Sequence, residues 1–116
     1  MDLWELIARE QIRDTIARYN HAGDSGRFDA MVECFTADGV LRVVGGDDHH
    51  GREALRAFFA GVQSGTSAPN GLTSLRHCVT NTLIHEVTPE GARADSYFQV
   101  ITDIGDRKST RLNSSH

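Results

Sequence analysis

The fold is decided by residues 75–104, which read LRHCVTNTLIHEVTPEGARADSYFQVITDI. From Leu75 onward, apolar and polar side chains alternate with a period of two for about a dozen residues, which is typical of a half-buried β-strand. Pro89-Glu90-Gly91 has the composition of a tight turn, and a second strand-like run follows over 92–104. The sequence therefore predicts a long antiparallel hairpin. The residues expected on one face of its first strand are Leu75, His77, Val79 and Leu83.

Three helices and a short strand are predicted upstream of this hairpin, from apolar residues that recur at helical spacing and from one β-branched run. The predicted helices are 3–22, 28–35 and 55–62, the predicted strand is Val40–Val44, and the predicted loops are 45–51 and 63–73. Since the helices come first and the antiparallel hairpin comes last, the order indicates an α+β fold rather than a wound parallel sheet.

Length and charge narrow the possible function classes. The chain has 116 residues, a formal net charge of −4 and two cysteines. This is the size of one domain, without the basic surface that nucleic-acid binding needs or the cysteines that a disulfide framework needs. No apolar run approaches the roughly 20 residues of a membrane helix. We therefore expect a soluble, cytoplasmic protein that binds neither nucleic acid nor a membrane.

The last eleven residues differ in composition from the rest of the chain. Residues 106–116 include one apolar residue and the only lysine, Lys108. Such a segment cannot supply a core face and is predicted to be disordered. It also resembles a translated reading frame of a sequencing-library adaptor. We therefore expect an incomplete domain over 1–105 without its final strands, an open edge on the strand 92–104, and a non-native tail over 106–116.

Three residues are candidates for acid–base chemistry. His77 is expected among apolar side chains, where an imidazole with an ordinary pKa of about 6.5 can act as a general base; the alternative is a core histidine bonded to a backbone carbonyl. Asp24 lies at the junction of the first two helices, where it either orients this histidine or caps the second helix. Tyr19 either polarises a substrate carbonyl or only packs. Tyr19 and Asp24 could line one cavity only if the helix ends first, as Gly23 allows.

The segment Asp47-Asp48-His49-His50 has the residue types of a metal site but not the spacing of one. Adjacent residues in a glycine-rich loop seldom converge on one ion, and no HxxxH or CxxC pattern supports them. A solvated loop is therefore favoured, and we expect no metal and no cofactor. Cys34 and Cys78 are expected to be buried thiols, since neither has the flanking residues of a nucleophile.

Five stretches together carry a resemblance to a known family. They are IRDTIARYNHAGD at 12–24, FDAMVECF at 28–35, GREALRAF at 51–58, LRHCVTN at 75–81 and ARADSYF at 92–98. In these stretches the chain resembles the SnoaL-like proteins of the nuclear-transport-factor-2-like superfamily. The resemblance implies a cone-shaped α+β barrel, in which a curved antiparallel sheet packs on N-terminal helices around a deep apolar pocket.

The resemblance also implies a reaction. In the dehydratases and the dehydrochlorinase of this superfamily an aspartate after the first helix pairs with a histidine on a strand. Asp24 and His77 match those positions, and Tyr19 matches a tyrosine of the bile-acid dehydratase. The expectation is a dehydratase-type lyase or isomerase that needs no cofactor and acts on an apolar, ring-bearing small molecule. In it His77 removes a proton, Asp24 holds the tautomer of His77, and Tyr19 stabilises negative charge.

Further side chains are expected to contact the substrate on the concave side of the sheet. They are Ile16, Phe58, Val79 and Asn81. The alternative function, from another class, is a non-catalytic ligand-binding or assembly domain of the same fold. A homo-oligomer, either a dimer or a trimer, is expected with either function.

Overall fold

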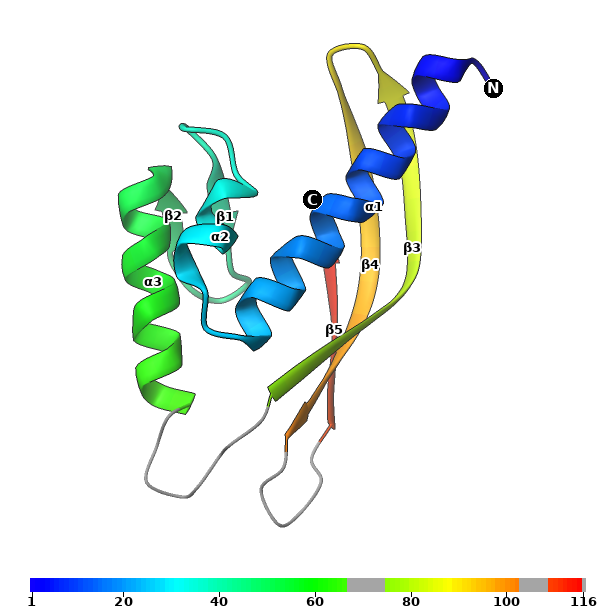
Figure 1. Cartoon of the computed structure of the whole chain (residues 1–116). Helices are drawn as coiled ribbons and strands as arrows, with labels where there is room; N and C mark the ends of the chain where they lie inside the picture. Colours follow the sequence, from blue (N-terminus) through cyan, green and yellow to red (C-terminus); the bar gives the residue numbers. More distant parts are fainter. Residues whose placement is uncertain (67–74, 103–108, 116) are drawn as a thin grey trace.

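The computed structural model describes residues 1–66, 75–102 and 109–115. Its elements are α1 (Leu3–Asp24), α2 (Phe28–Glu33), β1 (Val40–Arg42), β2 (Asp48–His50), α3 (Gly51–Thr66), β3 (Leu75–Thr88), β4 (Gly91–Thr102) and β5 (Ser109–Ser115). The strands form an antiparallel pair, β1-β2, and an antiparallel sheet in the order β3-β4-β5 (Figure 1). Helices packed against antiparallel sheets confirm the predicted α+β class.

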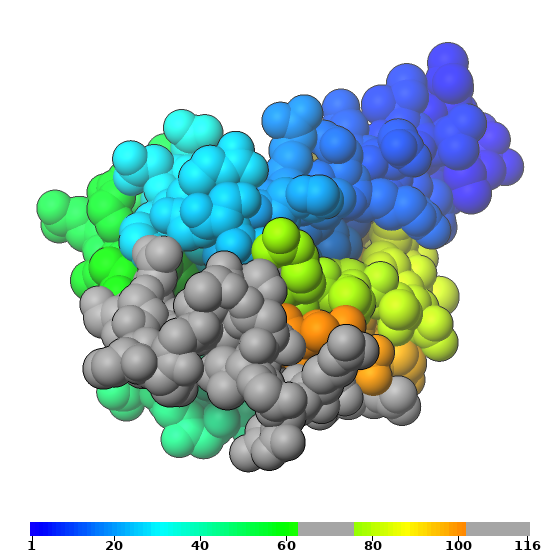
Figure 2. All heavy atoms as spheres, turned by 60° about the horizontal axis from the view of Figure 1, so that its bottom comes forward, coloured from blue at the N-terminus to red at the C-terminus, as the bar shows by residue number. Residues whose placement is uncertain are grey.

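The main core lies where the C-terminal end of α1 meets α2 and α3. Its buried members are Ala22, Met31, Val32, Leu55 and Phe59, with Tyr19, Phe28, Ala30, Phe35, Leu41 and Phe58 packed around them. The first turns of α1 lie at the other end of the molecule, away from this core (Figure 2). There Leu3, Leu6 and Ile7 keep 49–71% of their surface exposed. One end of α1 is therefore held by apolar packing, whereas the other end has little of it.

β3 and β4 form the predicted hairpin, with a β-bulge inside β3. Thr80 pairs with Tyr97 and Leu83 with Asp95, so residues 81 and 82 together oppose one residue of β4. Past the bulge, Ile84 is 4% exposed and Leu83 is 62% exposed. The prediction that Leu83 shares a face with His77 is therefore wrong, because strict alternation assumes a strand without an inserted residue.

One strand lies where the sequence predicted a loop. β2 falls inside 45–51 and pairs with β1, and β1 ends at Arg42 rather than at residue 44. The cross-strand contact is an ion pair between Arg42 and Asp48. Two histidines and an aspartate give no β-branched or alternating apolar signal, so the sequence pattern could not reveal this strand.

β5 lies in the segment that was predicted to be disordered. It pairs antiparallel with β4 from Asp95 opposite Ser115 to Ile101 opposite Ser109. The expected disorder is therefore wrong for 109–115, and so is the expected open edge on β4. Ladder hydrogen bonds join backbone groups, so a polar segment can fill a sheet edge without apolar side chains. The non-native origin of the segment stays a prediction.

Two further expectations concern segments that the structure describes only in part. The loop predicted over 63–73 lies largely outside the described residues, and its first part belongs to α3, which continues to Thr66. Among the described helices, none is both long and apolar enough to cross a membrane.

Candidate active site

Asp24 is the last residue of α1, which runs unbroken through Gly23. The alternative in which Asp24 caps the second helix is wrong, because Arg27 occupies the N-cap position of α2 and no side chain caps it. A carboxylate at the C-terminal end of a helix also meets the negative end of the helix dipole. Asp24 therefore lies where helix formation alone does not favour it, and its contacts explain the position.

The carboxylate of Asp24 makes three contacts with His77. The backbone N–H of His77 donates to Oδ1 and to Oδ2 at 3.1 Å each, and ring atom Nδ1 lies 2.6 Å from Oδ1. The side chain of Asp24 is 14% exposed and that of His77 is 26% exposed. The contact joins α1 to β3 across 53 positions of the sequence. The structure thus brings together the two residues that the sequence proposed as a pair.

The contact defines the tautomer of His77. An ionised carboxylate only accepts hydrogen bonds, so Nδ1 of the neutral ring carries the proton and donates it to Asp24. The other ring nitrogen, Nε2, then holds a lone pair and is free to accept a proton. Asp24 is also placed to stabilise the imidazolium that forms when Nε2 takes a proton.

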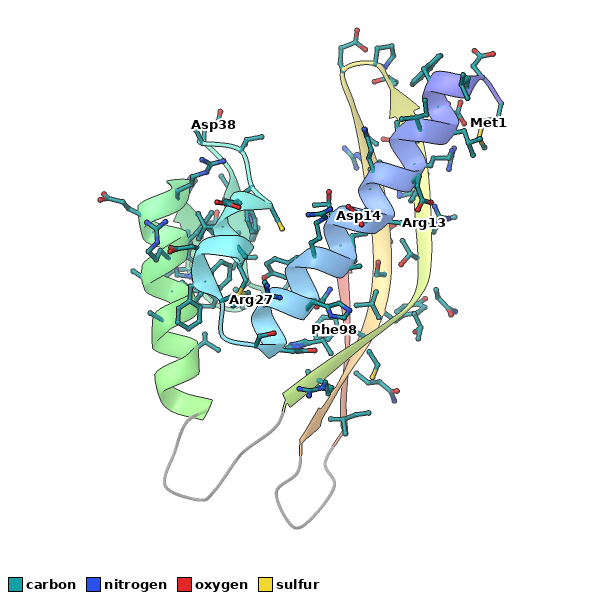
Figure 3. All side chains as sticks on the ribbon, in the orientation of Figure 1. Met1, Arg13, Asp14, Arg27, Asp38 and Phe98 are labelled. Atoms are coloured by element: carbon teal, nitrogen blue, oxygen red, sulfur yellow. The ribbon has the colours of Figure 1, made fainter. Side chains whose placement is uncertain are left out.

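The inner face of β3 and β4 continues from His77 into apolar surface. The ring of Phe98 lies 5.8 Å from that of His77, centroid to centroid, and Phe98 pairs in register with half-buried Val79. Figure 3 labels Phe98 near the C-terminal half of α1. Farther along this face, the hydroxyls of Thr82 and Ser96 are 3.0 Å apart. Phe98 was not among the predicted site residues, because its place beside His77 depends on the register of the hairpin.

Tyr19 lies in an aromatic cluster. Its ring meets Phe35 and Phe59 edge to face, with centroids 5.8 and 6.0 Å apart. Burial raises the pKa of the Tyr19 phenol to about 12, so the phenol remains a hydrogen-bond donor at neutral pH. Because α1 does not end before Asp24, the two residues stand about 140° apart around the helix. The expected break at Gly23 is thus wrong, and the catalytic role of Tyr19 stays a prediction.

The predicted substrate contacts fall in different places. Ile16 and Val79 are half-buried, on α1 and β3. Asn81 is exposed and has a left-handed backbone at the bulge, with φ of 54°. Phe58 lies on α3, where its ring packs 4.2 Å from that of His49. The structure brings Val79 close to the pair and places Phe58 with the β1-β2 hairpin, and the binding roles of all four residues stay predictions.

The residues of the segment 47–50 have contacts of their own. The Arg42 guanidinium donates to both carboxylate oxygens of Asp48 at 3.0–3.1 Å and lowers the pKa of that carboxyl. His49 packs on Phe58. Among the described residues no cluster of three or more His, Cys, Asp or Glu side chains could hold a metal ion. Cys34 and Cys78 are half-buried free thiols.

A second Asp–His pair lies on the opposite face of the hairpin. His85 Nε2 lies 2.9 Å from Asp95 Oδ2, and the two side chains are 36% and 44% exposed. Strict alternation from His77 would put His85, eight positions later, on the same face as His77, and the bulge at 81–82 reverses that placement.

Comparisons with known proteins agree with this fold. The family model of the SnoaL-like domain matches residues 4–115. No curated protein matches the chain.

Solved structures include a protein from Catenulispora acidiphila in complex with S-DNPA, with 27% identity, TM-score 0.74, and coverage of 95% of this chain and 81% of the other. A nuclear-transport-factor-2-like protein with a cystatin-like fold from Novosphingobium aromaticivorans has 29% identity, TM-score 0.72, and coverage of 99% and 73%. A protein proposed to be a scytalone dehydratase, from Novosphingobium aromaticivorans DSM 12444, has 17% identity, TM-score 0.74, and coverage of 95% and 70%, which supports the fold alone.

The family match extends over almost the whole chain and agrees with the helices and the antiparallel hairpin described above. The chain belongs to the SnoaL-like domain family, with the nuclear-transport-factor-2-like fold.

Proposed function

We propose that this protein is a dehydratase-type lyase or isomerase that works without a cofactor on an apolar small molecule. The observation that carries the proposal is the contact of the Asp24 carboxylate with Nδ1 of His77 at 2.6 Å. It leaves Nε2 as the proton acceptor. A positioned base of this kind is sufficient for proton removal next to a carbonyl or a leaving group.

The surroundings of the pair support an apolar substrate. Phe98 and Val79 lie beside His77 on the inner face, so a molecule that reaches Nε2 contacts hydrocarbon side chains. Partial burial keeps the pair away from much of the bulk water, which strengthens the charge interaction between Asp24 and an imidazolium. The Catenulispora acidiphila relative, solved with S-DNPA, is a family-level precedent for ligand binding by this fold.

The reaction can be tested before the natural substrate is known. The protein is incubated in D2O with a panel of apolar cyclic ketones that carry an acidic C–H, and deuterium incorporation is followed by mass spectrometry. Incorporation that disappears in His77→Ala and persists in His85→Ala supports the proposal. Equal incorporation in both variants and the parent contradicts it and favours the alternative of a ligand-binding or assembly domain.

A further inference from the structure

Helix α1 is fastened to the edge of β3 at two points. At the first, the Arg9 guanidinium donates to the backbone carbonyl of Ile84 at 2.8 Å, while its Nε donates to Glu5 Oε2 at 3.0 Å. At the second, Asp24 holds the backbone N–H and ring of His77. Both contacts use backbone groups of β3 that do not pair with β4, so Arg9 and the C-terminal residue of α1 satisfy backbone groups at this sheet edge.

The distance between the two contacts is nearly the same along the helix as along the strand. Arg9 and Asp24 are 15 positions apart on α1, which is about 22 Å at the helical rise of 1.5 Å per residue. His77 and Ile84 are seven positions apart on β3, which is about 23 Å for an extended strand. The helix and the strand run in opposite directions along this edge (Figure 1). Thus Arg9 reaches Ile84 when Asp24 reaches His77.

The bulge makes this double contact possible. In an antiparallel ladder the backbone groups of successive residues face alternate edges, so residues an odd number apart face opposite edges. His77 and Ile84 differ by seven positions. The extra residue at 81–82 changes this parity and turns both backbone groups toward α1. Asn81 accepts the left-handed φ of 54° that the bulge requires, as asparagine does more readily than most residues.

We infer that Arg9 is a positioning residue for the Asp24–His77 pair, and that the bulge at Asn81 sets the register on which it depends. The apolar side chains of the first turns are largely exposed, so packing fixes this half of α1 only weakly. Arg9 supplies the missing constraint through the Ile84 carbonyl. The inference rests on the proposed function in treating the pair as catalytic, whereas its geometry can be measured without a substrate.

The test follows backbone amide exchange by NMR in the full chain. In Arg9→Met we expect the His77 amide to exchange at least about tenfold faster, because the N-terminal half of α1 loses its contact with β3 and α1 can then tilt relative to the strand. The amide of Cys78, which faces β4, should keep its exchange rate. Arg9→Lys should restore much of the protection, since one donor suffices for the Ile84 carbonyl. Arg13→Met, an exposed position on the same helix, is the matched control and should leave both amides unchanged.

Two outcomes of the Arg9→Met experiment would overturn the inference. One is an unchanged His77 amide. The other is an equal increase at His77 and Cys78, which indicates general destabilisation rather than a lost position. A protein that shows the expected pattern but no deuterium transfer to any ketone refutes the proposed function and leaves the positioning role standing.

The bulge is tested separately by two substitutions of Asn81. Asn81→Gly tolerates a positive φ and should keep the His77 amide protected. Asn81→Val disfavours a positive φ, so the His77 amide should lose its protection from exchange in this variant. Circular dichroism should show that both variants are folded. Two results would show that Asn81 does not set the register. One is a valine variant whose His77 amide is as well protected as in the parent. The other is a valine variant that fails to fold together with a glycine variant that has lost the protection.

Discussion

The two faces of the β3-β4 hairpin each carry one Asp–His pair. The pairs consist of the same residue types, but they differ in the elements that they join, in their exposure and in the ring nitrogen that meets the carboxylate. The inner pair, Asp24–His77, joins a helix to a strand and is mostly shielded from water. The outer pair, His85–Asp95, joins two adjacent strands and is more exposed. The inner carboxylate contacts Nδ1, whereas the outer carboxylate contacts Nε2. The same two residue types therefore form a shielded contact between a helix and a strand in one setting, and a more exposed contact between two strands in the other.

The largest difference between the two pairs is expected in catalysis. His77→Ala should lower the rate of proton transfer by about 10²- to 10⁴-fold, as expected for loss of a general base. His85→Ala should stay close to the parent, because its side chain lies on the other face of the hairpin. Rates with any ketone found active in the deuterium assay measure both effects, with circular dichroism as the control for folding. Equal losses in the two variants would show that the faces do not differ in function.

The two carboxylates should also differ in their contribution to stability. Asp24→Asn removes the charge from a shielded group with three hydrogen-bond contacts and should lower the free energy of unfolding by about 1–3 kcal/mol. Asp95→Asn should lower it by roughly 0.2–1 kcal/mol, the range of exposed ion pairs. Urea unfolding at neutral pH measures both values. A larger loss from Asp95→Asn than from Asp24→Asn would contradict the assignment of inner and outer pairs.

Tyr19 and Tyr97 should also differ in how they titrate at high pH, because Tyr19 is partly buried against the core and Tyr97 lies on the outer face. The pKa of the Tyr19 phenol is raised by burial from 10.0 to about 12. Between these values the folded state binds more protons at this group than the unfolded state does, so this group makes stability fall as pH rises from about 10 to 12. Absorbance titration should show a phenol with a pKa of about 12 that Tyr19→Phe abolishes. Tyr97→Phe, on the outer face, should leave that titration step in place.

The sequence predicts those features that depend on local periodicity. The stripe of α1 and the turn at 89–91 are local signals, and the structure confirms both the helix and the hairpin. The resemblance to SnoaL-like proteins supplied the pairing of Asp24 with His77, which no spacing could have revealed because 53 positions separate them.

The features that the sequence did not reveal are set by how backbone segments pair with one another, which no apolar pattern marks. The bulge at 81–82 is one residue of mismatch between two strands, and it moves Leu83 to the outer face without any change in composition. β2 and β5 are polar segments that pair through their backbones, so no apolar pattern marks them. The anchoring contact between Arg9 and Ile84 likewise depends on a register that only the folded hairpin defines.

The proposed function requires that Asp24 holds His77 with its proton on Nδ1 and its lone pair on Nε2. The most direct measurement is ¹⁵N NMR of the histidine side chains at a pH where the rings are neutral, with His85 as the internal reference. We expect opposite tautomers: Nδ1–H for His77, and Nε2–H for His85, whose Nε2 lies 2.9 Å from Asp95. In Asp24→Asn the His77 ring should lose its preference for Nδ1–H, and the His85 ring should not change. A His77 ring that carries its proton on Nε2 in the parent protein would show that Asp24 does not set the tautomer of His77.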